Sequence, residues 1–523
     1  MRKDIKYISS LKIAVSGLLI LAILELIAIL ILNSGHLIFT LDDAYIHLRM
    51  AENLLQGHYG INLSESSSPS SSILWVFLLA PFTKLSFSNY VVLIINTLCA
   101  VGTLFLFWKV LTTVFKSEPE NKKTKITITW LLILLIFATN MISLIFIGME
   151  HSLQIFLVTL IICGLFHEIE QNKAEWWLIT AIVIAPLIRY ENFAISLLAI
   201  IFLFFRGYTK KSFTSAGLII LLFGSFTIFL SNLNLSPLPT SVKFKLSASS
   251  VSTSDEPINI FIERITDNPK AVLLLIGMFF ILYFSFFKKT NKREKLLSYV
   301  VNFGILLHLL IGKYGSFERY EIYIYTVTIL VILYLYKDNI VRIISDNSIL
   351  KMGAFLTIFV ILIFNSYIKA TFLTPIGSNN IYEQQYQMHR FAVNYYKKPV
   401  AVNDLGLVAF RNNSYVLDLL GLSSSEALKY RASGNNPDWM DKITKDHNVK
   451  FAMIYDKFEN IPAGWKKLGE LKLGKIKVTP SHSSVSFYAF DDSTYYKTYE
   501  LLKKFTTTLP KDSKFIFSKR LAK

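Results

Sequence analysis

The chain has 523 residues, of which 53% are apolar and 17% are charged, and its formal net charge is +18. Many unbroken apolar runs of about 18 residues or more are typical of membrane-spanning helices and exclude an ordinary soluble domain. The basic residues lie in short clusters between these runs and not among exposed aromatic residues, which argues against nucleic-acid binding.

The apolar runs recur from Leu11 to about Asn365 and then stop. The first run is too long for the core of a signal peptide and lacks a small-residue cleavage site, so it is interpreted as an anchor. We predict a mainly α, polytopic membrane domain of about 11–13 transmembrane helices over residues 1–370. The predicted spans are approximately 11–32, 72–88, 90–114, 126–147, 151–167, 176–188, 193–206, 215–232, 271–287, 297–312, 321–336 and 350–367.

The basic clusters set the expected orientation, because Lys and Arg are enriched in cytoplasmic loops. They comprise Arg2, Lys3, Lys6 and Lys12; Lys122, Lys123 and Lys125; Lys210 and Lys211; Lys288, Lys289, Lys292, Arg293 and Lys295; and Lys337, Arg342 and Lys351. This pattern places the N-terminus inside and residues 33–71, 233–270, 313–320 and everything after about 368 outside. An inside start and an outside end require an odd number of spans, whereas the prediction above gives an even number. The fault is expected between residues 72 and 147, where one block is two short helices, a re-entrant segment or half of a longer span.

After about Phe372 polar and charged residues return. Short β-rich runs alternate with helical stretches there, so we predict that residues 371–523 form a soluble, extracytoplasmic α/β domain. The β-rich runs are Pro399–Val402, Ser414–Leu417, Phe451–Ile454 and Val485–Phe490, and the helical stretches are Ser425–Tyr430 and Asp438–His447.

The first outer loop contains the most informative segment of the chain. Over residues 42–56 a helix would place Ile46, Met50 and Leu54 on one face, with Gly57 positioned to end it. We expect an amphipathic helix at the membrane surface. Asp43 and His47 are one turn apart on such a helix and face the same way.

Two interpretations of Asp42 and Asp43 remain open from spacing alone. Aspartate is a favoured N-cap and is stabilised near a helix N-terminus. Two carboxylates at the boundary of water and lipid also suit a general base beside a cation or phosphate ligand. Capping and catalysis are compatible, because a cap fixes the backbone that a catalytic carboxylate needs.

Residues 41–62, LDDAYIHLRMAENLLQGHYGIN, resemble the first-loop signature of GT-C glycosyltransferases. They are most similar to bacterial enzymes like the mycobacterial terminal β-arabinofuranosyltransferases. The segments Gly148–Leu153, Leu187–Glu191, Asn403–Gly406 and Leu417–Leu422 resemble further parts of that family, in the same order. Departures are the missing proline before Trp75, His151 and Ser152 in place of Thr and Pro, and Tyr190 in place of Pro.

The resemblance implies inverting transfer of a sugar, expected to be a pentofuranose, from a polyprenyl-phosphate donor. The expected acceptor is a cell-envelope glycan, lipid or protein at the outer face of the cell (inner) membrane, with membrane lipids as further partners. The absence of a Gly-rich phosphate loop from the sequence agrees with a lipid-linked donor. Such a donor needs an apolar groove between helices and a phosphate site at the boundary.

In this hypothesis Asp42 is the first candidate for the catalytic base, and Asp43 holds a metal, orients the acceptor or is itself the base. The candidate substrate-binding residues are His47, Arg49, Glu150, Arg189, Glu191, Lys243 and Arg319. Arg189 and Glu191 could instead form a mutual ion pair, and Lys243 and Arg319 could meet lipid headgroups. A divalent metal is an optional cofactor, but neither a spaced trio of ligands nor a CxxC or CxxxH motif around Cys99 and Cys163 supports it.

Two other functions fit a chain with many spans. A lipid or glycan transporter or flippase would show paired halves with matching broken helices or charges inside spans, and the sequence lacks such symmetry. A non-catalytic assembly subunit would tolerate neutralisation of Asp42.

Overall fold

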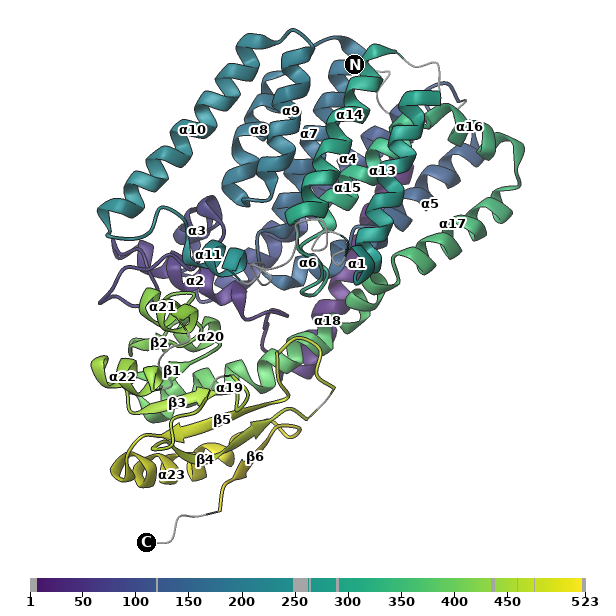
Figure 1. The fold of residues 1–523 in the computed structure, drawn as a ribbon. Helices are drawn as coiled ribbons and strands as arrows, with labels where there is room; N and C mark the ends of the chain where they lie inside the picture. The colour runs from purple at the N-terminus through teal and green to yellow at the C-terminus, as the bar shows by residue number, and fades with distance from the viewer. Residues whose placement is uncertain are drawn as a thin grey trace.

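The computed structural model describes residues 7–118, 121–247, 262, 265–287, 291–433, 438–458, 460–474 and 476–519. Over these residues the chain is a bundle of apolar helices with a small α/β domain at one end (Figure 1). This domain, from residue 400 on, is called the outer domain after its predicted side of the membrane. The predicted mainly α fold with a C-terminal α/β domain is confirmed. Of the predicted basic clusters, Arg2, Lys3, Lys6, Lys288 and Lys289 lie outside the described residues, as does much of the predicted outer loop 233–270.

Apolar helices of several lengths build the bundle. By length and composition, six of the described helices could cross a membrane: α1 (Ile8–Leu32), α4 (Ser88–Val114), α7 (His151–Gln171), α10 (Thr209–Asn232), α13 (Pro269–Phe287) and α14 (Lys292–Ile311). Two bent pairs add to these: α5 (Lys122–Ala138) with α6 (Met141–Ile147), and α17 (Ile349–Ile363) with the segment beginning at α18 (Asn365–Glu383). Shorter apolar helices are Ile73–Phe82, α8 (Trp176–Ile188), α9 (Asn192–Phe205) and α15 (Ile322–Leu335). This composition makes the chain a membrane protein.

The segment 72–88 does not run through the bundle. It forms α3 (Ile73–Leu79) and, directly after it, the short η1 (Ala80–Phe82), and the continuous helix Ile73–Phe82 is only about 15 Å long. Just before it, Ser70 contacts His47 of the first loop, and near its end Arg411 of the outer domain donates to the Leu85 carbonyl at 2.8 Å. One end of the segment therefore lies beside the first loop, and the other lies beside the outer domain. The predicted span at 72–88 is wrong as a single crossing helix, and the number of membrane passes stays a prediction.

The opposite end of the bundle carries many of the basic residues. Lys123 donates to the carbonyl of Ser345 in α16 (Lys337–Asp346) at 2.9 Å. Lys337 pairs with Glu170 at 3.1 Å, and Arg206 pairs with Glu168 at 2.9 Å. These contacts join helix ends remote from the outer domain (Figure 1). That this end faces the cytoplasm stays a prediction from the charge pattern.

The outer domain is a six-stranded mixed sheet with helices packed against it. The strand order is β2-β1-β3-β5-β4-β6, with β1 parallel to β2 and β3 and the remaining pairs antiparallel. The strands are β1 (Val400–Val402), β2 (Val416–Asp418), β3 (Phe451–Ile454), β4 (Lys466–Lys472), β5 (Ser484–Ala489) and β6 (Lys514–Phe517). The helices are α20 (Gly406–Ala409), α21 (Ser425–Ser433), α22 (Trp439–Asp446) and α23 (Asp492–Thr506). The predicted β-rich runs match β1, β2, β3 and β5, whereas β4, β6 and α23 were not predicted.

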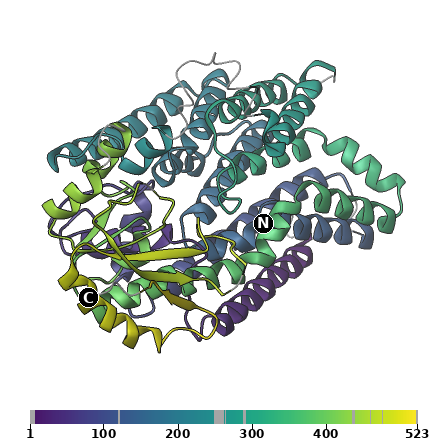
Figure 2. The same cartoon turned by 60° about the horizontal axis from the view of Figure 1, so that its bottom comes forward.

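The chain enters the outer domain without a flexible break. Helix α18 crosses the predicted boundary at residue 371 and is followed by α19 (Gln385–Arg390) and a π-helical turn, η2 (Phe391–Tyr396). Seen from the outer-domain side in Figure 2, the sheet covers only part of the end of the bundle.

The first loop lies between the bundle and the outer domain. Its helix α2 (Asp43–Leu54) packs against α3 of the membrane part and α20 of the outer domain, and most of its residues are buried. Gly57, with φ +76°, follows α2, as the sequence predicts. Further along the loop, the Asn62 amide exchanges two hydrogen bonds with the backbone of Val416, at 2.9 and 3.0 Å. The expectation of an amphipathic helix resting on the membrane surface is wrong, because protein covers both of its sides.

Candidate functional site

The break between α8 and α9 is built by a proline and two polar side chains. Pro186 has no N–H to donate to the carbonyl of Ile182, four residues earlier. The hydroxyl of Ser196 on α9 donates to that carbonyl instead, at 2.7 Å. Asn192 donates to the carbonyl of Ala185 at 2.9 Å. The chain can therefore leave the helix at Arg189, which adopts an extended backbone.

The break before α7 is set by a glycine. Gly148 has φ +74°, and a Cβ there would lie 2.4 Å from the ring of Phe39. The first loop packs closely over this turn, and the backbone N–H of Thr40 donates to the Phe146 carbonyl at 3.0 Å. Glycine thus allows both the turn and the close approach of the first loop, which brings Glu150 beneath α2.

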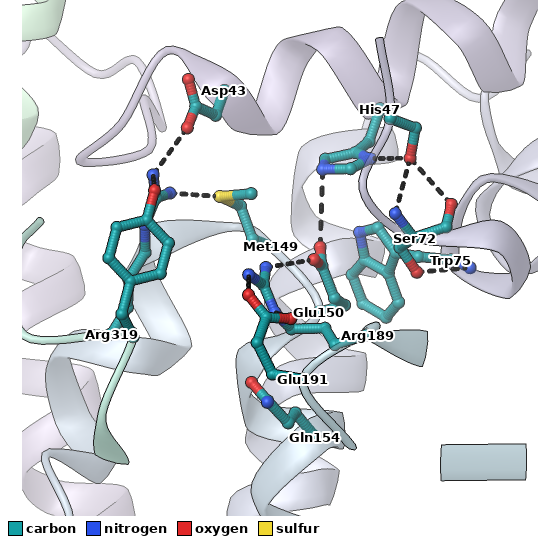
Figure 3. A network of polar contacts seen from close by, with 12 residues as sticks. Asp43, His47, Ser72, Trp75, Met149, Glu150, Gln154, Arg189, Glu191 and Arg319 are labelled. Atoms are coloured by element: carbon teal, nitrogen blue, oxygen red, sulfur yellow. Dashed lines mark hydrogen bonds and ion pairs between the residues drawn. The ribbon is translucent and has the colours of Figure 1, made fainter. Parts of the chain in front are cut away.

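Four of the predicted residues meet at these breaks (Figure 3). The guanidinium of Arg189, 1% exposed, donates to Glu150 at 2.7 Å and to both carboxylate oxygens of Glu191 at 2.7 and 3.1 Å. His47 Nε2 lies 3.4 Å from the second oxygen of Glu150, and its Nδ1 lies 3.0 Å from the Ser70 hydroxyl. One arginine thus faces two carboxylates, and His47 is a further polar partner of Glu150.

A second charged pair joins the first loop to the segment before α15. Arg319 donates to Asp43 Oδ2 at 2.7 Å, and another of its nitrogens contacts the sulfur of Met149, next to Glu150. The Arg319 side chain is 5% exposed, whereas that of Asp43 is 42% exposed. Figure 3 shows Asp43 and His47 pointing from α2 toward this group of residues. The pair therefore consists of a fixed cation and a carboxylate that solvent and ligands can reach.

Asp42 points away from this cluster, toward the outer domain. Its two carboxylate oxygens accept hydrogen bonds from the backbone N–H groups of Gly406 at 2.7 Å and Leu407 at 2.8 Å. A Cβ on Gly406 would lie 2.1 Å from the Asp42 carbonyl oxygen, so only glycine allows this approach. Asp42 occupies the N-cap position of α2, but its side chain makes no capping hydrogen bond. The capping interpretation is thus wrong for Asp42.

Asp42 lies half-buried among other carboxylates. Its pKa is raised to about 8: burial is the largest cause, the Asp404 and Asp43 carboxylates act in the same direction, and the two backbone hydrogen bonds oppose them. Asp404 accepts hydrogen bonds from Gln385, at 2.8 Å, and from the Tyr455 hydroxyl. Burial raises the pKa of Asp404 as well. This group of residues belongs to the contact between the first loop and the outer domain.

Besides Asp42, two predicted site residues lie outside the Asp43–Arg319 and Glu150–Arg189 groups. Arg49 donates to the Ile61 carbonyl at 3.0 Å and to the Asn412 carbonyl at 2.9 Å, and it pairs with Glu52 at 2.8 Å. It connects α2, the rest of the first loop and the outer domain. Lys243 is exposed on α11 (Thr240–Ser247).

Comparisons with known proteins give only distant likenesses and assign no activity. A family profile described as a domain of unknown function (DUF8728) matches residues 379–496, within the outer part of the chain. No curated protein matches the sequence. Similar solved structures include the Archaeoglobus fulgidus oligosaccharyltransferase in its apo form, with a TM-score of 0.46 and 11% identity over 98% of this chain and 76% of that one.

Two further structures of that archaeal protein give similar values. The form tethered to an acceptor peptide has a TM-score of 0.44 and 12% identity, covering 98% of this chain and 76% of that one. The complex with zinc and sulfate has a TM-score of 0.44 and 10% identity, covering 95% and 74%. Values this low transfer no residue role to this chain.

The site does not fit a metal as it stands. Within the described residues, no group of three or more His, Cys, Asp or Glu side chains is arranged to hold an ion. Both oxygens of Asp42 already accept backbone hydrogen bonds, and Asp43 is paired with Arg319. No step is therefore assigned to a metal.

Several residues to which the sequence assigned no role in the site complete this region. Met149 contacts Arg319. Glu321, two residues after Arg319, forms an ion pair of 2.7 Å with Lys270, and Asp404 lies near Asp42. Glu321 stands two residues after Arg319 at the start of an apolar run, a position in which a charged residue is a functional candidate.

Proposed function

We propose that this protein is a GT-C-type glycosyltransferase that moves a sugar from a polyprenyl-phosphate donor to a cell-envelope acceptor. The observation that carries the proposal is the pair of half-exposed Asp43 and buried Arg319 on the side of the bundle that meets the outer domain. A carboxylate within 2.7 Å of a fixed guanidinium supplies the two charges that transfer from a phosphate ester requires. The likeness of residues 41–62 to GT-C first loops points to the same reaction.

In the proposed reaction the acceptor hydroxyl oxygen attacks the anomeric carbon, and the bond from that carbon to the phosphate oxygen breaks. Asp43 takes the hydroxyl proton as the new bond forms. The leaving polyprenyl phosphate keeps the bonding electron pair, and Arg319 stabilises its increased negative charge. A single displacement inverts the configuration at the anomeric carbon.

The geometry favours Asp43 over Asp42 as the base. Asp42 is held by two backbone N–H groups, while Asp43 is open to solvent on one side. In the resting arrangement Arg319 neutralises Asp43, which weakens it as a base. The donor phosphate would compete for Arg319, so that binding of the donor frees Asp43 to accept a proton. Catalysis would then begin only when the donor is in place.

A lipid-linked donor also suits the shape of the membrane part. A groove of about 760 Å³ runs between α1, α5, α17 and α18 and is lined mostly by apolar side chains. Phe137 and Ile368 line it, and their neighbours Asn140 and Tyr367 hydrogen-bond to the loop and helix start that carry Arg319. An isoprenoid chain in this groove would have its phosphate end directed toward the site. A pentofuranose is the proposed sugar, on the family resemblance alone.

The test is transfer by the purified protein in lipid nanodiscs, with a panel of polyprenyl-phosphate pentoses and hexoses. Wild type is expected to consume at least one donor, and Arg319→Ala to raise the donor KM and lower kcat/KM by about 10²–10³-fold. Arg206→Ala is the matched control, because Arg206 also pairs with a carboxylate, that of Glu168, but lies at the opposite end of the bundle. A wild type inert across the panel would favour the transporter or assembly-subunit hypothesis.

A further inference from the structure

The backbone that carries Arg319 is strained. Residues 315–318 all have positive φ, at 77°, 51°, 59° and 63°, and only the first of them is a glycine. In this region the Cβ of an L-residue crowds the following carbonyl, so successive non-glycine residues rarely adopt it. The turn closes with the N–H of Arg319 donating to the Gly315 carbonyl at 3.1 Å. Such strain persists only where the surroundings over-determine the conformation.

Glu321 supplies that constraint at the start of the turn. Its carboxylate is fully buried and accepts a hydrogen bond from the N–H of Gly315 at 2.8 Å. The same carboxylate accepts from Lys270 of α13 at 2.7 Å and from the Tyr367 hydroxyl of α18 at 3.1 Å. One side chain thus ties the first residue of the turn to two separate helices.

The end of the turn, Glu318, is also held by Lys270 and by the start of α18. The carboxylate of Glu318 pairs with Lys270 and lies 3.4 Å from the Ser366 hydroxyl, and its carbonyl accepts from Asn140 at 3.3 Å. Between these two anchors the chain turns so that the Arg319 side chain leaves toward Asp43. The fork of an arginine recognises a phosphate only in a fixed orientation, so the anchors determine whether Arg319 can do so.

We propose that Glu321 is a positioning residue for Arg319, acting through the left-handed turn at residues 315–318 and touching no substrate. The inference rests on the proposed function, in which Arg319 binds the donor phosphate. Glu321 would otherwise be explained only as the partner of Lys270 in a buried ion pair.

The first experiment is a double-mutant cycle on donor KM. Glu321→Gln keeps the size of the side chain and removes its charge, and it is expected to raise the donor KM about tenfold with kcat changed less than about threefold. In an Arg319→Ala background the same change is expected to have no further effect on KM, because Glu321 then has no arginine to position.

Glu170→Gln is the matched control. Glu170 also accepts from a tyrosine, Tyr334 at 2.8 Å, and from a lysine, Lys337 at 3.1 Å, but at the far end of α15. Its substitution is expected to leave the donor KM unchanged. An equal rise in KM for the control, or effects of Glu321→Gln and Arg319→Ala that add, would overturn the inference.

A second variant acts on the turn alone. A Cβ on Gly315 would meet no atom within 4 Å, so Gly315→Ala changes only the preference of the backbone at φ +77°. It is expected to raise the donor KM in the same direction as Glu321→Gln, and an unchanged KM would overturn the inference even if Glu321→Gln does not fold. An inert wild type would overturn the proposed function and this inference together, whereas an active wild type with additive variants would overturn only the inference.

Discussion

The two faces of α2 have different partners although they belong to one short helix. One face directs Asp43 toward Arg319 and His47 toward Glu150. On the other side, Asp42 and Arg49 bind backbone groups of the outer domain. Adjacent aspartates can therefore have separate tasks, because about 100° of rotation per residue sends them toward different parts of the protein.

This comparison predicts two separable kinds of loss. Changes on the Asp43 face should affect transfer, and changes on the Asp42 face should affect how firmly the outer domain is attached. Glu150 is an exception to this division. It lies on the Asp43 side, but it is fully buried beside Arg189, so its loss should affect stability.

Glu150→Ala is expected to have the largest effect on stability. It leaves Arg189 with only Glu191 and removes the carboxylate near His47, and breaking a buried pair costs about 3–5 kcal/mol. Thermal unfolding of the purified protein in detergent, followed by intrinsic fluorescence, would measure the loss. A midpoint within 2 °C of wild type would show that this pair does not stabilise the bundle.

Asp42→Asn is expected to have a smaller effect that depends on pH. The Asp42 pKa rises from 3.8 to about 8 in the folded protein, so folding favours its protonated form. That contribution is complete below pH 3.8 and is lost as pH rises through about 8. The unfolding midpoint of wild type should therefore exceed that of the variant by more at pH 5 than at pH 8, and a difference that grows with pH would contradict this assignment.

Arg49→Lys should cost least of the three. Lysine can keep the ion pair with Glu52. It lacks the planar guanidinium with which Arg49 donates to the Ile61 and Asn412 carbonyls at the same time. The expected loss is about 1–2 kcal/mol. Limited proteolysis should cut near the outer domain faster in this variant, while transfer per folded molecule stays unchanged. A loss of transfer without faster cleavage would show that Arg49 serves the reaction and not the attachment of the outer domain.

Much of the site could be predicted because its residues interrupt apolar runs. Glu150 and the Arg189–Glu191 pair stand where spans break, and Asp43 and His47 are one turn apart on a helix that the sequence indicates clearly. Which aspartate faces the bundle could not be predicted, since Asp42 finds its partners at Gly406 and Leu407, more than 360 residues later in the chain.

The missed features depend on contacts that leave little trace in the sequence. Segment 72–88 has the apolar composition of a span, but α3 and η1 are too short to cross and turn back under the outer domain. Strand β6 is a short edge strand that pairs only with β4. Glu321 carries no motif of its own, and its partners Lys270 and Tyr367 come from two other helices.

The central claim is that Asp43 serves the reaction and Asp42 serves the attachment of the outer domain. Single-turnover sugar transfer by Asp43→Asn and Asp42→Asn, with donor saturating, tests it most directly. Asp43→Asn is expected to slow transfer by about 10²–10⁴-fold, the usual contribution of a general base, and Asp42→Asn by less than about threefold. The reverse ranking, or equal rates for both variants, would contradict the account.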